Sequence, residues 1–142
     1  MTNKIKVIEN KIINHKDGNI LKGINHDDDD FDRFGELYFS YIKLNAIKAW
    51  KKHNQMKMNL FVPFGKVKFV FFSKNFVKLK ELIVDGKNNN RITVRPKIWY
   101  GFKGLFHEQS LVVNLANISH SDFEMERLEI NNEFIDYDWN KE

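Results

Sequence analysis

A cluster of cationic and aromatic residues lies in one short segment, Ile47–His53, which contains Lys48, Trp50, Lys51 and His53. Lysine side chains hold anions such as phosphate, and a histidine can take or give a proton near neutral pH. If the segment is extended, Lys51 and His53 project to one face and Lys52 to the other. The pattern favours a site for an anionic or keto-bearing ligand, although a solvated strand end has the same composition.

A second cluster of aromatic residues, Trp99, Tyr100 and Phe102, follows a turn that begins at Pro96. Aromatic rings in such runs usually belong to a core. Tyr100, which stands next to Gly101, is the residue of this cluster whose hydroxyl can serve a pocket as a hydrogen-bond or proton donor.

The remaining histidines and acidic residues give weaker signals. His26 precedes four consecutive acids, Asp27 to Asp30, but the run lacks the sixth-position glycine and closing glutamate of an EF-hand loop, so a solvated loop is expected. His107 and His120 are isolated in the sequence, and we expect them at the surface or in local hydrogen bonds.

The composition limits the class of protein that can carry these residues. The chain has 142 residues, enough for one domain, and 23 basic against 19 acidic residues leave a formal charge of +4. The absence of cysteine excludes disulfides, thiolate metal sites and cysteine nucleophiles. No apolar run approaches the ~20 residues of a membrane-spanning helix, and the N-terminus has no signal-peptide core. These features predict a soluble, cytoplasmic protein with no membrane partner.

The elements that position the candidate residues are predicted to be short strands. Apolar runs rich in β-branched and aromatic residues are bounded by turn residues, and several alternate with the period of a half-buried strand. Ser121 and Glu124 form the spacing of a capping box, which predicts a short helix over 121–128. Short, closely spaced strands indicate an all-β sandwich or barrel. The predicted strands are Glu36–Lys43, Ala46–Trp50, Met58–Val62, Val67–Phe72, Phe76–Ile83, Arg91–Val94 and Leu111–Leu115.

Three stretches together resemble a known family: GELYFSYIKLNAIKAWKKHNQMKMNLFVPFGKVKFVFF, VRPKIWYGFKGL and SLVVNLANISHSDFEMER. Their order is similar to that of the dTDP-4-dehydrorhamnose 3,5-epimerase-like branch of the cupin superfamily. The resemblance implies a single cupin domain over residues 1–142, a small jelly-roll barrel with its core at about 35–127. It also implies a homodimer and a nucleotide-linked keto sugar as ligand.

The resemblance also implies which residues form the site. The metal-binding cupins use a His-x-His pair and a later histidine, where this chain has Lys51-Lys52-His53 and Tyr100, so no metal and no cofactor are expected. The epimerase histidine base falls on Lys51, the later lysine near Met58 and the tyrosine acid near Asn114. His53 matches the second histidine of the sister sugar 3,4-ketoisomerases.

Proton chemistry beside a carbonyl then assigns roles to the matched residues. A lysine base must lose about three pKa units to work near neutral pH, whereas a histidine needs no shift. We therefore expect His53 to be the base, Lys51 the cation that holds an enolate or phosphate, and Tyr100 the acid. Substrate contacts are expected from Lys48 to the diphosphate, from stacking on Trp50 and Trp99, and from Met58 and Asn114.

The predicted function is an epimerase or keto-isomerase acting on a nucleotide-linked, dTDP-type 4-keto-6-deoxy sugar in surface-polysaccharide biosynthesis. Two alternatives stay open. The substitutions at Lys51, Met58 and Asn114 also suit a cupin that binds the nucleotide sugar without chemistry. Basic residues interleaved with aromatics, Lys66 and Lys68 with Phe69 and Phe71, suit a nucleic-acid-binding barrel, although alternating barrel strands already explain that pattern.

Overall fold

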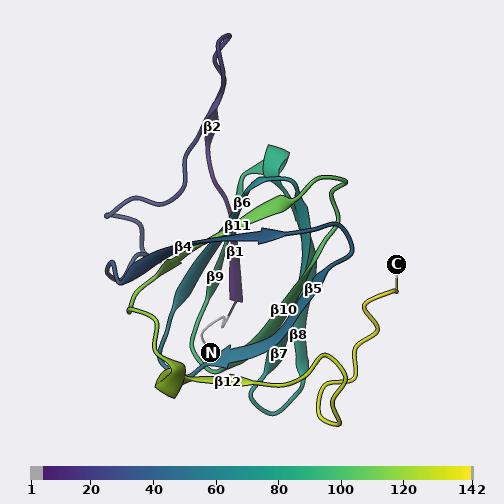
Figure 1. Cartoon of the computed structure of the whole chain (residues 1–142). Coiled ribbons are helices and arrows are strands. Elements are labelled where there is room, and N and C mark those ends of the chain that lie inside the picture. The colour runs from purple at the N-terminus through teal and green to yellow at the C-terminus, as the bar shows by residue number, and fades with distance from the viewer. Residues whose placement is uncertain (1–4, 142) are drawn as a thin grey trace.

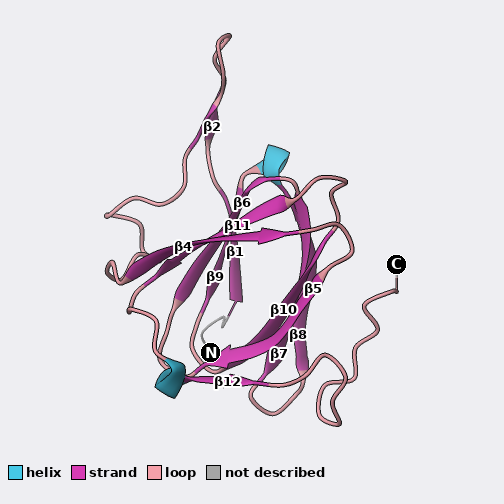
Figure 2. Cartoon of the chain, in the orientation of Figure 1, coloured by secondary structure: helices cyan, strands magenta, loops and turns pink. Residues whose placement is uncertain are grey.

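The chain folds almost entirely into antiparallel strands, which Figures 1 and 2 show as a barrel with one protruding hairpin. This computed structural model describes residues 5–141. None of these residues forms a helix that is long and apolar enough to cross a membrane. The strands are β1 Ile5–Glu9, β2 Ile12–Ile13, β3 Ile20–Leu21, β4 Glu36–Ile42, β5 Ile47–His53, β6 Met58–Phe64, β7 Lys66–Ser73, β8 Lys78–Asp85, β9 Asn90–Val94, β10 Ile98–Gly104, β11 Ser110–Ala116 and β12 Met125–Arg127.

Two five-stranded sheets form the barrel. The first has the order β1-β9-β6-β11-β4, and the second has the order β12-β5-β10-β7-β8. Side chains alternate between the two faces of each strand, and the inward-facing ones, such as Phe69, Phe71 and Leu60, form the main core between the sheets. The predicted all-β class is confirmed, and each of the seven predicted strands is present with bounds shifted by at most a few residues.

A second core covers the outer face of the second sheet. Trp50, Val70 and Phe72 on this face pack against Ile135 and Trp139, which belong to the segment after β12. We call residues 128–141 the C-terminal strap. Figure 1 shows it leaving β12 and running along the outside of the barrel to the C-terminus. Both this strap and β1 lie outside the predicted barrel core of 35–127. The strap covers the outer face of the second sheet, and β1 is an edge strand of the first.

The acidic run Asp27–Asp30 is not simply solvated, as the sequence suggested. Its loop lies over the outer face of the first sheet, where Asp30 and Asp28 are 3.6 and 3.9 Å from the Arg91 guanidinium. The Arg91 side chain is only 3% exposed, so a buried cation draws the second and fourth acids of the run inward.

Candidate active site

A cavity of about 990 Å³ opens between the edge strand β4 of the first sheet and strands β5 and β12 of the second. Its wall combines titratable groups with apolar ones, as ligand sites usually do. The lining includes Tyr38, Ser40, Lys48, Lys51, His53, Met56, Leu60, Tyr100, Phe102, Asn114, His120 and Arg127, together with strap residues Glu129, Asn131, Asn132, Glu133 and Phe134.

A bulge in β5 turns its cationic residues toward this cavity. Against β10, Lys51 pairs with Tyr100 but Ala49 pairs with Gly101, so Trp50 is the extra residue. A one-residue slip exchanges the two faces of a strand, and therefore Lys48 and Lys51 both reach the cavity although they are three positions apart. Lys52 faces the other way, as predicted, and pairs with Glu126 at 2.8 Å.

His53 lies in the cavity wall as one half of a buried, hydrogen-bonded dyad. Its Nδ1 bonds Glu124 Oε2, and the two side chains are 6% and 4% exposed. Because the carboxylate accepts, Nδ1 carries the proton and Nε2 keeps its lone pair on the cavity side. Burial and the charge of Lys51 lower the pKa of His53, against the raising influence of Glu124, so the ring is neutral near pH 7.

Glu124 belongs to the site, although its spacing from Ser121 predicted only a helix cap. Of the short helix predicted over 121–128, only a 3-10 turn over Asp122–Glu124 forms. Ser121 caps it as expected, but the chain then leads directly into β12. The Glu124 carboxylate turns inward, where it accepts the backbone N–H groups of Gln55 at 3.0 Å and Met56 at 2.9 Å as well as His53. These bonds outweigh burial and hold its pKa below the usual range, so it stays ionised beside the imidazole.

Two phenols face the cavity from opposite sheets. The Tyr100 hydroxyl, on β10, is 3.4 Å from His53 Nε2, and the two rings stack at 6.0 Å. Burial and then Glu124 raise the pKa of Tyr100. Tyr38, on β4, donates to Glu36 at 3.2 Å, and burial and Glu36 raise its pKa to about 12. Both phenols therefore keep their protons at neutral pH and can act as donors.

Three cations, Lys48, Lys51 and Arg127, line the cavity. Lys51 is half-buried, and its pKa is lowered by desolvation and by the neighbouring charges of Arg127 and Lys48. Lys48 donates to Ser40 Oγ at 2.9 Å and to the carbonyl of Tyr41 at 2.7 Å, which ties β5 to β4 at the cavity mouth. Such a group of mutually repelling cations is suited to an anion.

Not all of the predicted substrate contacts reach this cavity. The Trp99 side chain packs in the outer core with Trp50, and Met58 packs inside the barrel core. Trp99 and Met58 are thus not part of the cavity wall, whereas Trp50 lines the cavity although its ring packs in the outer core. The predicted substrate contacts from these three residues stay predictions. Asn114 does line the cavity, where its buried Oδ1 has no hydrogen-bond partner among residues 5–141.

The other histidines divide between surface and site. His26 and His107 are at the surface, with side chains 89% and 74% exposed. His120 has the expected local bond, to Asp122 at 3.1 Å, but it also lines the cavity next to Tyr38. Within residues 5–141, no three histidine, aspartate or glutamate side chains come together in a way that would hold a metal ion.

Comparisons with known proteins place this fold. No family model matches the chain. A probable low-salt glycan biosynthesis epimerase of Haloferax volcanii is 24% identical over 134 residues, which cover 88% of this chain and 86% of that protein. The crystal structure of a dTDP sugar isomerase from Desulfovibrio desulfuricans G20 is 27% identical, covers 96% of this chain and 90% of its own, and superposes with a TM-score of 0.89.

More distant structures share the architecture. A dTDP-6-deoxy-D-glucose-3,5-epimerase from Legionella pneumophila, solved with dTDP-4-keto-L-rhamnose, has a TM-score of 0.80 at 16% identity and covers 91% of this chain and 74% of its own. A sugar 3,4-ketoisomerase from Thermoanaerobacterium thermosaccharolyticum, solved with TDP, has a TM-score of 0.73 at 18% identity and covers 90% of each chain. The predicted resemblance and the jelly-roll fold are therefore confirmed.

Proposed function

We propose, from the premise that this chain has the fold of the dTDP-sugar epimerases and isomerases, that it is an enzyme of that class. Its substrate in this proposal is a nucleotide-linked, dTDP-type 4-keto-6-deoxy sugar, and its reaction moves a proton at a carbon beside the carbonyl. The Haloferax relative supports a role in the biosynthesis of a surface polysaccharide.

The observation that carries the proposal is the buried His53–Glu124 pair, whose unprotonated Nε2 lies beside the Tyr100 hydroxyl in the cavity wall. A proton beside a carbonyl is removed by a neutral base of pKa near the working pH, and this pair supplies one. As Nε2 takes the proton, the C–H electron pair moves into an enolate, and the negative charge develops on the former carbonyl oxygen. Glu124 stabilises the imidazolium that results, as an orienting carboxylate does in other proton-transfer sites.

The remaining groups receive roles from their position. Lys51 is the half-buried cation on the same strand face as His53, so it is placed to stabilise the enolate or a phosphate. Tyr100, whose hydroxyl is protonated and next to Nε2, returns the proton. Lys48 and Arg127 also line the cavity, are more exposed than Lys51, and are assigned to the diphosphate.

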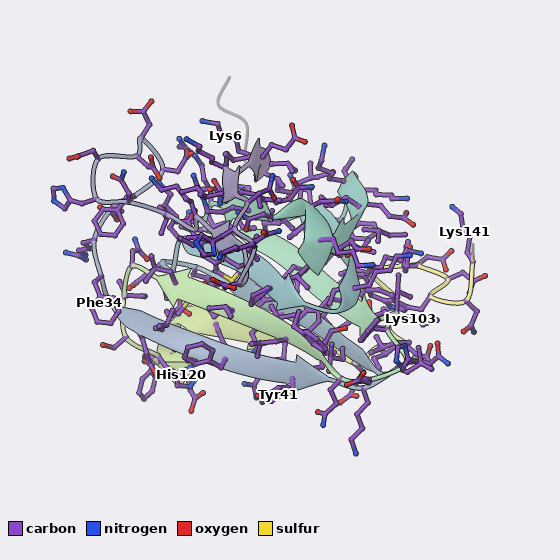
Figure 3. The ribbon with its side chains drawn as sticks, turned by 90° about the horizontal axis from the view of Figure 1, so that it is seen from above. Lys6, Phe34, Tyr41, Lys103, His120 and Lys141 are labelled. Carbon is purple, nitrogen blue, oxygen red and sulfur yellow. The ribbon has the colours of Figure 1, made fainter. Side chains whose placement is uncertain are left out.

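We also propose that the chain forms a homodimer. The outward face of β4 presents Leu37, Phe39 and Tyr41, which are 44%, 63% and 61% exposed. Figure 3 shows Tyr41 beside this strand, on the outside of the barrel. A contiguous apolar face on an edge strand is a common basis for pairing with a second copy.

The test of the enzyme proposal uses the protein in deuterated water with several nucleotide-linked 4-keto-6-deoxy sugars. Deuterium entering carbon 3 or carbon 5, read by NMR or mass, supports the enzyme and identifies the carbon that is altered. Saturable binding without exchange would instead favour the non-catalytic nucleotide-sugar-binding cupin. Neither binding nor exchange with any of these sugars would overturn both readings.

A further inference from the structure

The C-terminal strap contributes a preformed turn to the cavity mouth. We call residues 129–134 the mouth turn. It begins after Leu128, which exchanges two backbone hydrogen bonds with Trp50, at 3.0 and 3.1 Å. It ends at Ile135, which is buried in the outer core. Because both ends are held by the barrel, the turn keeps a fixed place beside the cavity.

Asn132 closes this turn from within. Its Oδ1 accepts the N–H groups of Phe134 at 2.8 Å and Ile135 at 2.7 Å, and its Nδ2 donates to the carbonyl of Glu129 at 2.9 Å. The Asn132 side chain is thus committed to the turn, whereas the Asn131 and Glu133 side chains form no hydrogen bond or ion pair within residues 5–141. Both residues line the cavity.

Phe134 ends a stack of aromatic rings that leads from the core to the mouth. Trp99 is buried and stacks on Phe76 at 6.2 Å, and Phe76 stacks on Phe134 at 5.1 Å with an angle of 23° between the rings. Phe76 covers one face of the Phe134 ring, yet Phe134 is still 51% exposed and lines the cavity. The other face is therefore open to a planar ligand group.

The groups that line the cavity differ in burial. His53 is buried and Tyr100 is half-buried, whereas Glu133 and Phe134 of the mouth turn are exposed. A carboxylate repels a diphosphate but accepts hydrogen bonds from N–H groups. A planar base with an N–H edge thus fits the mouth better than the phosphates do.

We infer that the mouth turn is the nucleobase-binding element of the site, in which Phe134 stacks on the base and Glu133 and Asn131 bond its N–H edge. This inference rests on the proposed function, because it assigns the nucleoside end of the same ligand. The strap thereby sets nucleotide specificity without contributing to proton transfer.

The experiment measures binding of dTDP and of inorganic pyrophosphate by calorimetry. Stacking of a base on an aromatic ring typically contributes ~1–3 kcal/mol, so Phe134→Ala should weaken dTDP binding by about tenfold. Pyrophosphate affinity should not change, because the cations are intact. Phe134→Trp should restore dTDP binding, and Phe123→Ala is the matched control, since Phe123 is fully exposed and outside the cavity.

Two results would overturn the inference alone: Phe134→Ala binds dTDP as tightly as the unaltered protein, or it loses dTDP and pyrophosphate affinity by the same factor. An equal loss of both affinities would mean that the Phe134 ring positions the cations and does not stack on the nucleobase. If the unaltered protein does not bind dTDP at all, the proposed function fails together with it. Melting curves of each variant show whether the strap stays docked.

Discussion

Replacing Glu124 with glutamine tests the buried dyad with little change of shape. The amide oxygen can still accept the N–H groups of Gln55 and Met56, so the turn around them is kept. The amide nitrogen, however, faces His53 Nδ1 with donors. The imidazole can then bond it only as the tautomer that carries its proton on Nε2, which removes the lone pair from the cavity.

The magnitude follows from the hydrogen bond that is lost. A hydrogen bond to a charged group contributes ~1.5–3 kcal/mol. If the inactive tautomer of His53 is favoured by this same free energy, turnover falls by roughly 10- to 150-fold. The assay is the rate of deuterium entry beside the carbonyl at saturating substrate. Affinity for dTDP should stay the same, because Glu124 bonds the catalytic base His53 and not the phosphates.

Glu126→Gln is the matched control for this prediction. Glu126 is two residues farther along β12, pairs with Lys52 outside the cavity and is 53% exposed at its side chain. Its replacement should leave the exchange rate unchanged. Equal rates for Glu124→Gln and the unaltered protein, with both folded, would refute the reasoning that the carboxylate sets the tautomer of His53.

Three further predictions follow from the same structure. Because the pKa of His53 lies below its ordinary 6.5, a pH-rate profile should show turnover rising with pH through an acid limb below 6.5. Lys51→Met should move that limb to higher pH, because it removes a positive charge that lowers the pKa of His53. Tyr41→Lys should convert a dimer of twice the 17.0 kDa chain mass into monomer in light scattering, whereas Val77→Lys, also at a residue 61% exposed, should not. Gly101→Ala should lower the free energy of unfolding by ~1–3 kcal/mol in denaturant titration, because the new Cβ would lie 2.5 Å from another Cβ; an unchanged midpoint would show that the sheet and strap can shift apart.

The strands and the face of β5 were predictable because they depend on local patterns. Alternation of apolar residues and turn chemistry at Gly65 and Asp85 gave the strands, and the same alternation placed Lys51 and His53 on one face. The aromatic run after Pro96 is not among the predicted strands, whereas it forms β10 and carries Tyr100 in a strand. Aromatic residues favour strands, but Gly101 and Gly104 interrupt this run and weaken the strand pattern.

The missed parts of the site depend on contacts between distant segments. Glu124 has the spacing of a helix cap with Ser121, and only the fold brings it to His53, 71 residues earlier. Phe134 follows the barrel in sequence, and its place beside the cavity depends on how the strap packs against distant strands. Its signal was a run of apolar residues after β12, at Phe134, Ile135 and Trp139, which is more than an exposed tail requires.

The proposed reaction requires the imidazole at position 53 as the base. The direct measurement compares deuterium entry into a dTDP-linked 4-keto-6-deoxy sugar by the unaltered protein and by His53→Asn, after calorimetry has shown that both bind dTDP equally. We predict exchange at the carbon beside the carbonyl with the unaltered protein and a loss of about 10²-fold or more in the variant. Exchange at the same rate in both proteins would contradict the account.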